Sequence, residues 1–162
     1  MSDRSAGDGP ASDAGAGRRF CLVASRFNQP ITDRLVDGAR SCLVAHGADP
    51  ADVELIRVPG AFELPLAVRW VLDRGGVDGV AALGCVIRGE TPHFEFVSLG
   101  ATLGIEAIAR ERGIPVAFGV LTTDDGAQAR ARAGGQKGNK GEEAALALLE
   151  MCELERTLRA GN

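Results

Sequence analysis

The residues best suited to chemistry lie in one short stretch, where an apolar run gives way to Gly89 and then to Thr91, Pro92 and His93. Threonine followed by proline is typical of a helix start, with Thr91 as the N-cap and Pro92 at the first helical position. The first N–H groups of a helix have no partner within it, so this turn is suited to bind an anion. His93 is one of two histidines in the chain, and the positive end of the helix dipole there favours a neutral imidazole, which can act as a general base.

Apolar, β-branched runs alternate with helical patterns along the chain and form the framework that must position this stretch. We predict strands at residues 20–24, 53–58, 80–87 and 116–121. We predict helices at residues 31–46, 63–73, 91–112, 128–133 and 142–158. Because the strands are almost continuously apolar, both faces of their sheet must be covered. This order of elements predicts an α/β protein, a three-layer α/β/α sandwich around a mainly parallel four-stranded sheet, of the flavodoxin-like class.

Polar and aromatic residues follow each predicted strand. In an open parallel sheet, ligands bind beyond the carboxyl ends of the strands. The four loops expected to share that rim are residues 25–30, 59–65, 88–95 and 122–125. None of them carries the glycine pattern of a dinucleotide-binding protein or of a P-loop, so both of those classes lose their main support.

The composition of the chain narrows its class and its surroundings. We expect one domain over residues 20–162, preceded by a disordered extension over residues 1–19, which is rich in Gly, Ala, Ser and Asp and has no apolar segment of the secretory kind. The net charge is −4, with both signs interspersed, and no run has the apolar length of a membrane span. We therefore expect a cytoplasmic protein whose partners include neither nucleic acid nor membrane.

The four cysteines are widely spaced, form no CxxC pair and lie within apolar runs. This pattern fits buried free thiols better than disulfides or zinc ligands, and we expect no metal site. Nothing basic adjoins Cys85, so we do not expect it to act as a nucleophile.

In several ordered blocks the chain resembles the 6,7-dimethyl-8-ribityllumazine synthase family, over about residues 20–158. The blocks are Phe27-Asn28, Pro59 to Pro65, Gly84 to Glu95, Gly119 to Asp124 and Gly138 to Gly141. In that family 5-amino-6-(D-ribitylamino)uracil condenses with 3,4-dihydroxy-2-butanone 4-phosphate to give the lumazine, phosphate and water. This is the penultimate step of riboflavin biosynthesis. The resemblance implies a transferase that uses two small-molecule substrates and no metal or organic cofactor.

The resemblance also implies a role for each matching residue. His93 is the general base and acid, because imine formation, enolisation and ring closure each move protons. Phe27 stacks on the uracil ring. The residues expected to bind the ribitylaminouracil are Phe27, Ala61, Phe62, Glu63, Cys85, Val86, Ile87 and Phe118. Those expected to bind the butanone phosphate are Glu90, Thr91 and Arg132, with Lys140 as a further candidate.

Three arginines compete for the phosphate. Arg130 lies two residues before Arg132 on the same predicted helix, so the two side chains face different sides and only one can reach the site. The match of the residues that follow Arg132 favours it over Arg130. Arg88 is a third candidate, with a surface ion pair as an equal alternative.

Other assignments also have structural alternatives. Glu63 lies at a helix start, where a carboxylate can simply favour the helix dipole. Phe62 and Phe118 can serve as core residues, and Lys140 can lie on a solvated face. His46, at the other end of a helix, is expected to be only a favourable cation at the negative pole.

Members of the family form pentamers with each active site built between neighbouring subunits, and some assemble into an icosahedral shell of sixty subunits. The resemblance therefore implies a homopentamer. The glycine-rich loop at residues 135–141 resembles the short form of the segment associated with shells, so we expect a shell here too, with riboflavin synthase as a further partner. Glycine in this loop permits the close approach of another subunit.

Two rival functions are considered. One is a relative of the same fold that binds lumazine or flavin, or builds a shell, without turnover; the presence of His93 and of the phosphate residues argues against it. The other is a flavodoxin-like electron carrier with flavin mononucleotide at the same rim. Such a carrier needs a phosphate loop rich in glycine and hydroxyl groups after the first strand, and residues 25–30 have too few of both.

Overall fold

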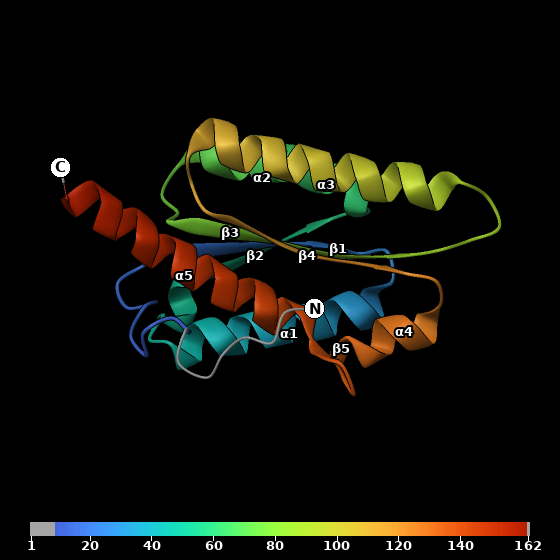
Figure 1. Cartoon of the computed structure of the whole chain (residues 1–162), viewed down its shortest axis with the longest axis horizontal. Coiled ribbons are helices and arrows are strands. Elements are labelled where there is room, and N and C mark those ends of the chain that lie inside the picture. Colours follow the sequence, from blue (N-terminus) through green and yellow to red (C-terminus); the bar gives the residue numbers. More distant parts are fainter. Residues whose placement is uncertain (1–8, 162) are drawn as a thin grey trace.

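A sheet of parallel strands forms the middle layer of the protein (Figure 1). The computed structural model describes residues 9–161. The sheet is built from four strands, β1 (Phe20–Ser25), β2 (Val53–Val58), β3 (Gly79–Ile87) and β4 (Val116–Thr123). They lie in the order β2-β1-β3-β4, and each neighbouring pair is parallel. The predicted parallel four-stranded sheet is confirmed.

Helices cover both faces of this sheet. The helices are α1 (Gln29–Ala45), α2 (Leu64–Arg74), α3 (His93–Arg112), α4 (Gly126–Ala131) and α5 (Lys140–Ala160). Helices α2 and α3 lie on one face, whereas α1, α4 and α5 lie on the other (Figure 1). Short 3-10 turns at Pro50–Asp52 and Ala61–Glu63 precede β2 and α2. The three-layer α/β/α sandwich is therefore confirmed, and the bounds of the predicted helices and strands agree with the structure within two residues.

The two faces of each strand feed two separate apolar cores. Along β1, Leu22 packs into the core under α1 and α5, whereas Val23 packs into the core under α2 and α3. Both side chains are fully buried. Successive side chains of a strand point to opposite faces, so a strand covered on both sides must be apolar throughout. This explains why the strands could be recognised as continuous apolar runs.

The strand order creates a crevice at one end of the sheet. The chain passes from β1 outward to β2 and then crosses to the other side of β1 to form β3 and β4. As a result, α1 leaves the end of β1 toward one face and α3 leaves the end of β3 toward the other (Figure 1). Such a reversal point is where open α/β sheets bind their ligands. Phe27 lies in the loop after β1, and His93 begins the helix that follows β3.

Helix α3 starts two residues later than predicted. Its first residue is His93, and its N-cap is Pro92, with φ −65° and ψ 0°. The Pro92 carbonyl already accepts the N–H of Glu95 at 2.9 Å, a tight first turn. Thr91, the predicted N-cap, therefore lies one position before the observed N-cap, although His93 remains in the first turn.

Residues 9–19 do not form the disordered extension that the composition predicts. The N–H of Gly15 donates to the His46 carbonyl at 2.7 Å, and Arg18 donates to the Cys152 carbonyl at 3.3 Å. Ala14 is buried beside them. This segment therefore packs against the C-terminal end of α1 and the interior of α5, and its small residues permit the close approach. Residues 1–8 of the predicted extension lie outside the described residues.

The glycine-rich segment before α5 forms an antiparallel hairpin that the sequence analysis missed. Its strands are β5 (Ala133–Gly135) and β6 (Gly138–Asn139). Gly134 and Gly138 have positive φ values of 90° and 79°, which glycine adopts without strain. Asn139 then caps α5 by accepting the N–H of Gly141 at 2.8 Å, and it donates to the Arg34 carbonyl on α1 at 2.9 Å. The Gly138–Gly141 block thus joins α5 to α1.

The cysteines are free and buried, as predicted. No helix within residues 9–161 has both the length and the apolar character needed to cross a membrane. Over the same residues, no group of three or more His, Cys, Asp or Glu side chains is arranged to hold a metal ion.

Candidate active site

A pocket of about 700 Å³ lies in the crevice at the carboxyl ends of the strands. Its walls are the loops after β1, β2 and β3 together with the first turn of α3. Its size suits a small organic substrate. Nine of the predicted site residues line it, namely Phe27, Ala61, Phe62, Glu63, Cys85, Val86, Ile87, Thr91 and His93.

The turn after β1 presents an aromatic ring at the mouth of the pocket. Phe27 is 71% exposed, although its backbone is held firmly, because its N–H donates to the Pro59 carbonyl at 3.0 Å. Asn28 follows in the left-handed region, with φ 58°, and its side-chain amide donates to the Cys85 carbonyl at 3.0 Å. These two bonds fix the turn to the loop after β2 and to β3. An exposed ring on a fixed backbone is a suitable stacking surface for a flat heterocycle.

The loop after β2 contributes Phe62 and Glu63 to the lining of the pocket. The Glu63 carboxylate accepts the N–H of Gly60 at 2.9 Å, so it caps the 3-10 turn while it lines the pocket. Phe62 lies across α3 at Gly100, where an added Cβ would come within 3.2 Å of its ring. Phe62 is nevertheless 63% exposed. It is therefore not a core residue within this chain.

The end of β3 offers a backbone edge to the pocket. Strand β3 pairs with β1 only as far as Leu83, but it pairs with β4 as far as Ile87. The backbone of residues 85–87 therefore borders the pocket on the β1 side, where its polar groups can bind the edge of a heterocycle. Cys85 is 2% exposed, and burial raises the pKa of its thiol to about 11. It stays protonated near neutral pH, which agrees with the prediction that it is not a nucleophile.

The loop between β3 and α3 combines His93 with open backbone donors. Among the residues that the structure describes, the N–H groups of Glu90 and Thr91 meet no acceptor within the protein. The Thr91 hydroxyl lies 3.5 Å from the N–H of His93, a long contact. His93 is exposed to the pocket at the start of α3. This loop can bind an anion beside an imidazole, although Glu90 itself does not line the pocket.

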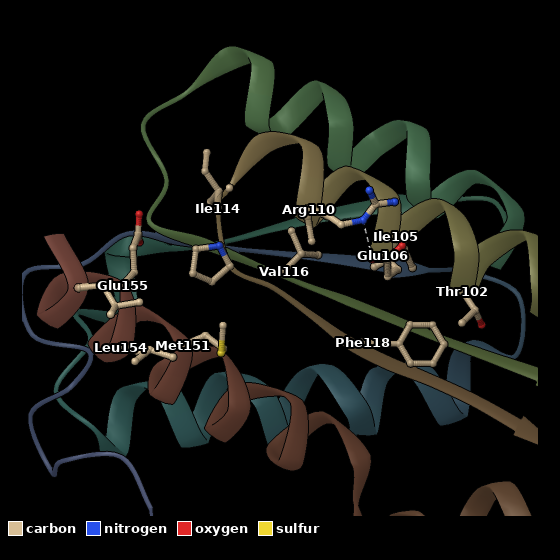
Figure 2. A pocket seen from close by; sticks show the side chains of 14 residues that line it. Thr102, Ile105, Glu106, Arg110, Ile114, Val116, Phe118, Met151, Leu154 and Glu155 are labelled. Atoms are coloured by element: carbon tan, nitrogen blue, oxygen red, sulfur yellow. Dashed lines mark hydrogen bonds and ion pairs between the residues drawn. The ribbon is translucent and has the colours of Figure 1, made fainter.

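Phe118 lies away from this pocket. It is on the edge strand β4 and is 36% exposed. Figure 2 shows it in a second, largely apolar pocket of about 660 Å³, with Met151 and Leu154 of α5 also lining that space. Helix α3 borders the pocket through Ile105. Phe118 is thus neither in the first pocket nor in the core.

The two predicted cations are also outside the first pocket. Arg132 is the C-cap of α4, and its guanidinium donates to the Gln128 carbonyl at 3.1 Å. Lys140 pairs with Glu143 at 3.2 Å. Arg132, at the end of α4, and Lys140, at the start of α5, belong to elements on the opposite face of the sheet from α3 (Figure 1). Phe118 lies on β4 in the second pocket, so none of these three residues lines the His93 pocket.

The chain is similar to one family of known proteins over most of its length. The family model described as 6,7-dimethyl-8-ribityllumazine synthase matches residues 17–156. The chain belongs to this family. Relatives that carry the same description come from Halorhodospira halophila, Wolinella succinogenes and Helicobacter hepaticus, with identities of 54%, 53% and 50%. Each alignment covers 142 residues, which is 88% of this chain and 91% of the relative.

Within this member of the lumazine synthase family, six residues that line the pocket had no predicted site role, namely Pro59, Gly60, Gly89, Phe94, Phe96 and Val97, and neither had Asn28 beside it. Phe94, Phe96 and Val97 line it from the first turns of α3, and Asn28 holds its floor through Cys85. The helical spacing of Phe94 and Val97 could have indicated a shared face toward the crevice. The role of Asn28 depends on a contact between distant parts of the chain and left no local signal.

Proposed function

We propose that this protein catalyses the condensation of 5-amino-6-(D-ribitylamino)uracil with 3,4-dihydroxy-2-butanone 4-phosphate to 6,7-dimethyl-8-ribityllumazine. Family membership over residues 17–156 supports the reaction. The observation that carries the proposal in the structure is the position of His93 beside the unpaired N–H groups of Glu90 and Thr91, in a pocket that also presents Phe27. One site thus offers a stacking surface, an anion cradle and a proton-transfer group.

The chemistry can be assigned to these groups step by step. The aromatic amine attacks the ketone carbon, and loss of water gives an imine. Removal of a proton next to the imine lets the C–O bond to phosphate break, with the electron pair leaving on the phosphate. The enol left by this elimination takes up a proton at its terminal carbon and becomes a methyl ketone. The ribitylamino nitrogen then attacks this new carbonyl group, and a second loss of water closes the ring. His93 is positioned to accept and return the protons, while the N–H groups of Glu90 and Thr91 bind the phosphate.

Binding of the uracil substrate uses the opposite side of the pocket. In this proposal Phe27 stacks on the ring, and the backbone of residues 85–87 bonds to its edge. Glu63, with Ala61 and Phe62, holds the ribityl chain. Because these groups belong to fixed loops, most of the rate would come from holding the two substrates together rather than from a strong base.

We propose that a second copy of the chain completes the site. Among the predicted ligands, Phe118 and Arg132 lie outside the first pocket, and Phe118 instead lies beside an open apolar surface. Apolar side chains that are about half exposed or more extend over both regions, and a surface of this kind favours association between subunits. They are Phe62, Leu66, Trp70, Phe96, Leu99, Leu103, Met151, Leu154 and Leu158.

The assembly that we propose is a homopentamer in which Phe118 and Arg132 of one subunit, with Lys140 as a further candidate, reach the His93 pocket of the next. The hairpin at residues 133–139 projects from the sandwich and is proposed to support contacts between pentamers in a sixty-subunit shell, with riboflavin synthase as a partner. We place the reaction in the cytoplasm, a location supported by four free thiols. Sedimentation that finds only pentamers would remove the shell from this proposal.

The deciding experiment is to mix the full-length protein with both substrates and to follow the absorbance of the lumazine and the release of phosphate. The spontaneous reaction without protein is subtracted. Formation of both products in proportion to protein concentration supports the proposed function. A folded oligomer that leaves the spontaneous rate unchanged overturns it and favours a relative that binds lumazine or builds a shell without turnover.

A further inference from the structure

Arg88 joins three parts of the rim. Its Nε donates to Asp124, after β4, at 2.9 Å, and its Nη1 donates to Glu95, in the first turn of α3, at 3.2 Å. The guanidinium carbon also lies 4.4 Å from the centre of the Phe94 ring, within the range of a cation–π contact. The hydrogen bonds to Asp124 and then to Glu95 raise the pKa of Arg88. Its guanidinium is thus directed at two carboxylates rather than at the pocket.

These contacts enclose the loop of residues 89–92. Arg88 lies directly before the loop and continues the sheet, since its N–H donates to the Thr123 carbonyl at 2.8 Å. Glu95 and Phe94 lie directly after the loop, on the helix that begins with His93. Phe94 lines the pocket, so the guanidinium packs on a wall of the site. The Arg88 side chain therefore links the residues before and after the loop that holds Glu90 and Thr91.

The same arginine reaches the start of α4. The N–H of Asp124 donates to the Gln128 side chain at 3.0 Å, and Asp125 caps α4 at 2.8 Å. Helix α4 ends at Arg132, the cation that we propose acts in a neighbouring site. The Arg88–Asp124 pair thus connects the anion-binding loop of one site with the helix that supplies the cation for another.

We propose that Arg88 is a positioning residue, which holds the 89–92 loop and the start of α3 so that the phosphate-bearing substrate meets the Glu90 and Thr91 N–H groups and His93, and which does not bind the phosphate itself. This inference rests on the proposed function. It separates two alternatives that the sequence left open, because a guanidinium paired with Asp124 and Glu95 is unsuited to serve as the phosphate ligand. A change of substrate position by about 1 Å is enough to alter the rate strongly.

The test compares steady-state kinetics of full-length variants. Arg88→Gln is expected to raise the KM for the butanone phosphate on the order of 10-fold and to change the KM for the ribitylaminouracil by less than about 2-fold. Arg88→Lys, which keeps the charge but loses the fork, should lie between Arg88→Gln and the wild type. Asp124→Asn should raise the same KM, and the Arg88→Gln/Asp124→Asn double variant should be no worse than Arg88→Gln alone.

Arg69→Gln is the matched control. Arg69 has a side chain that is 45% exposed, compared with 44% for Arg88, and it also pairs with two carboxylates, Asp73 and Glu111, on α2 and α3. It lies on neither the pocket nor the loop. Both KM values should stay at their wild-type level in this variant.

The outcomes separate the alternatives. If Asp124→Asn leaves the KM unchanged while Arg88→Gln raises it, Arg88 contacts the phosphate directly and the proposal is overturned. The proposal is also overturned if Arg88→Gln raises the KM values for both substrates equally, or raises neither. Should Arg88→Gln fail to fold, Arg88→Lys and Asp124→Asn carry the same test.

Amide hydrogen exchange makes the test independent of turnover. Faster exchange at the start of α3 in Arg88→Gln and Asp124→Asn, and not in Arg69→Gln, is the result that the positioning role requires. Unchanged exchange contradicts the role. A wild-type protein without turnover would overturn the proposed function, and the exchange result would still decide whether Arg88 orders this loop.

Discussion

The side-chain amide of Asn28 donates a 3.0 Å hydrogen bond to the carbonyl oxygen of Cys85 and thereby joins the turn after β1 to the end of β3. Asn28 has φ 58° and ψ 43°, a left-handed conformation that asparagine tolerates better than most residues. The bond and the backbone conformation can be separated by substitution. Asn28→Gly keeps the conformation and removes the bond, whereas Asn28→Ala removes the bond and adds strain.

We expect Asn28→Gly to lower the free energy of unfolding by about 1 kcal/mol and Asn28→Ala to lower it by about 2 kcal/mol. Both should raise the KM for the ribitylaminouracil, because Phe27 and the backbone of residues 85–87 lose their common support. Urea unfolding and steady-state kinetics measure the two effects. If the two variants bind this substrate as the wild type does, the bond has no role in shaping the pocket.

Glu63 caps a turn, and we propose that it also binds the ribityl chain; substitutions can distinguish the two roles. Its carboxylate caps the turn through the Gly60 N–H, which a glutamine oxygen can also do. Glu63→Gln should therefore keep the wild-type stability but raise the KM for the ribitylaminouracil, because a neutral amide accepts hydrogen bonds from hydroxyl groups less strongly. Glu63→Ala should lose the cap as well, at a cost of about 1 kcal/mol. Identical kinetics for Glu63→Gln and the wild type would leave Glu63 with the capping role alone.

A site shared between subunits predicts recovery of activity by mixing. His93→Ala alone should slow turnover by roughly 10²-fold or less, and Arg132→Ala should raise the KM for the butanone phosphate more than that for the uracil. When equal amounts of the two variants are refolded together, about one quarter of the sites should combine an intact His93 with an intact Arg132 from the neighbour. At a low concentration of the butanone phosphate, the rate of the mixture should therefore exceed the average of the rates of the two variants.

The control for this mixing experiment is the pair His93→Ala and Phe27→Ala. Both residues line the same pocket of one chain, so no mixture of these two variants contains a complete site. A rate above the average of the two variants is therefore expected only for the first pair. Recovery in both mixtures would contradict the shared site.

The sequence predicts the sheet, its helices and most of the residues that line the first pocket, because these depend on local patterns. Continuous apolar runs mark strands covered on both faces, and the loops after such strands meet at one rim. Phe27, Glu63 and His93 could therefore be assigned to one site. The first-turn position of His93 followed from the proline before it.

The remainder depends on contacts that local patterns do not encode. The separation of Phe118 from His93 follows from the place of β4 at the sheet edge, and Arg132 is on the opposite face because α4 follows β4 to that side. Residues 9–19 were misjudged because small residues are typical of disordered segments and also of close packing, here between Gly15 and His46. The hairpin was missed because its glycines serve as turn residues.

Close packing between α1 and α5 makes Gly141 sensitive to substitution. A Cβ at this position would overlap the Leu35 carbonyl, and backbone cannot move aside as a flexible side chain can. Gly141→Ala should lower the free energy of unfolding by about 3 kcal/mol or more. Gly76→Ala is unsuitable as the control, because Gly76 has φ 78° and an alanine there would be strained. Gly89→Ala is the control, because its added Cβ meets open space, and it should change the free energy of unfolding by less than about 1 kcal/mol. Thermal unfolding at fixed protein concentration measures both.

The buried thiols predict that stability falls at alkaline pH. Burial raises the pKa of Cys21 from 9.0 to about 12 and that of Cys85 from 9.0 to about 11. Below pH 9 these thiols are protonated in both the folded and the unfolded chain, so their contribution to stability is fully present. Above pH 9 the unfolded chain releases protons that the folded chain keeps, so the free energy of unfolding falls by about 1.4 kcal/mol per thiol for each pH unit until the folded pKa is reached.

The chain is well suited to test this dependence, because it has no tyrosine, and its lysines are Lys137 and Lys140 alone. Urea unfolding at pH 7, 9 and 10.5 should show little change over the first interval and a clear loss over the second. Cys21→Ala should be less stable than the wild type at pH 7. Its free energy of unfolding should fall less between pH 9 and 10.5, since the thiol with the highest pKa is absent. An equal alkaline loss of stability in Cys21→Ala and the wild type would show that other groups cause it.

The buried, protonated Cys85 also predicts that iodoacetamide at pH 7 leaves the turnover of the wild type intact. Inactivation would contradict the assignment of Cys85 as a residue that lines the pocket without a chemical role.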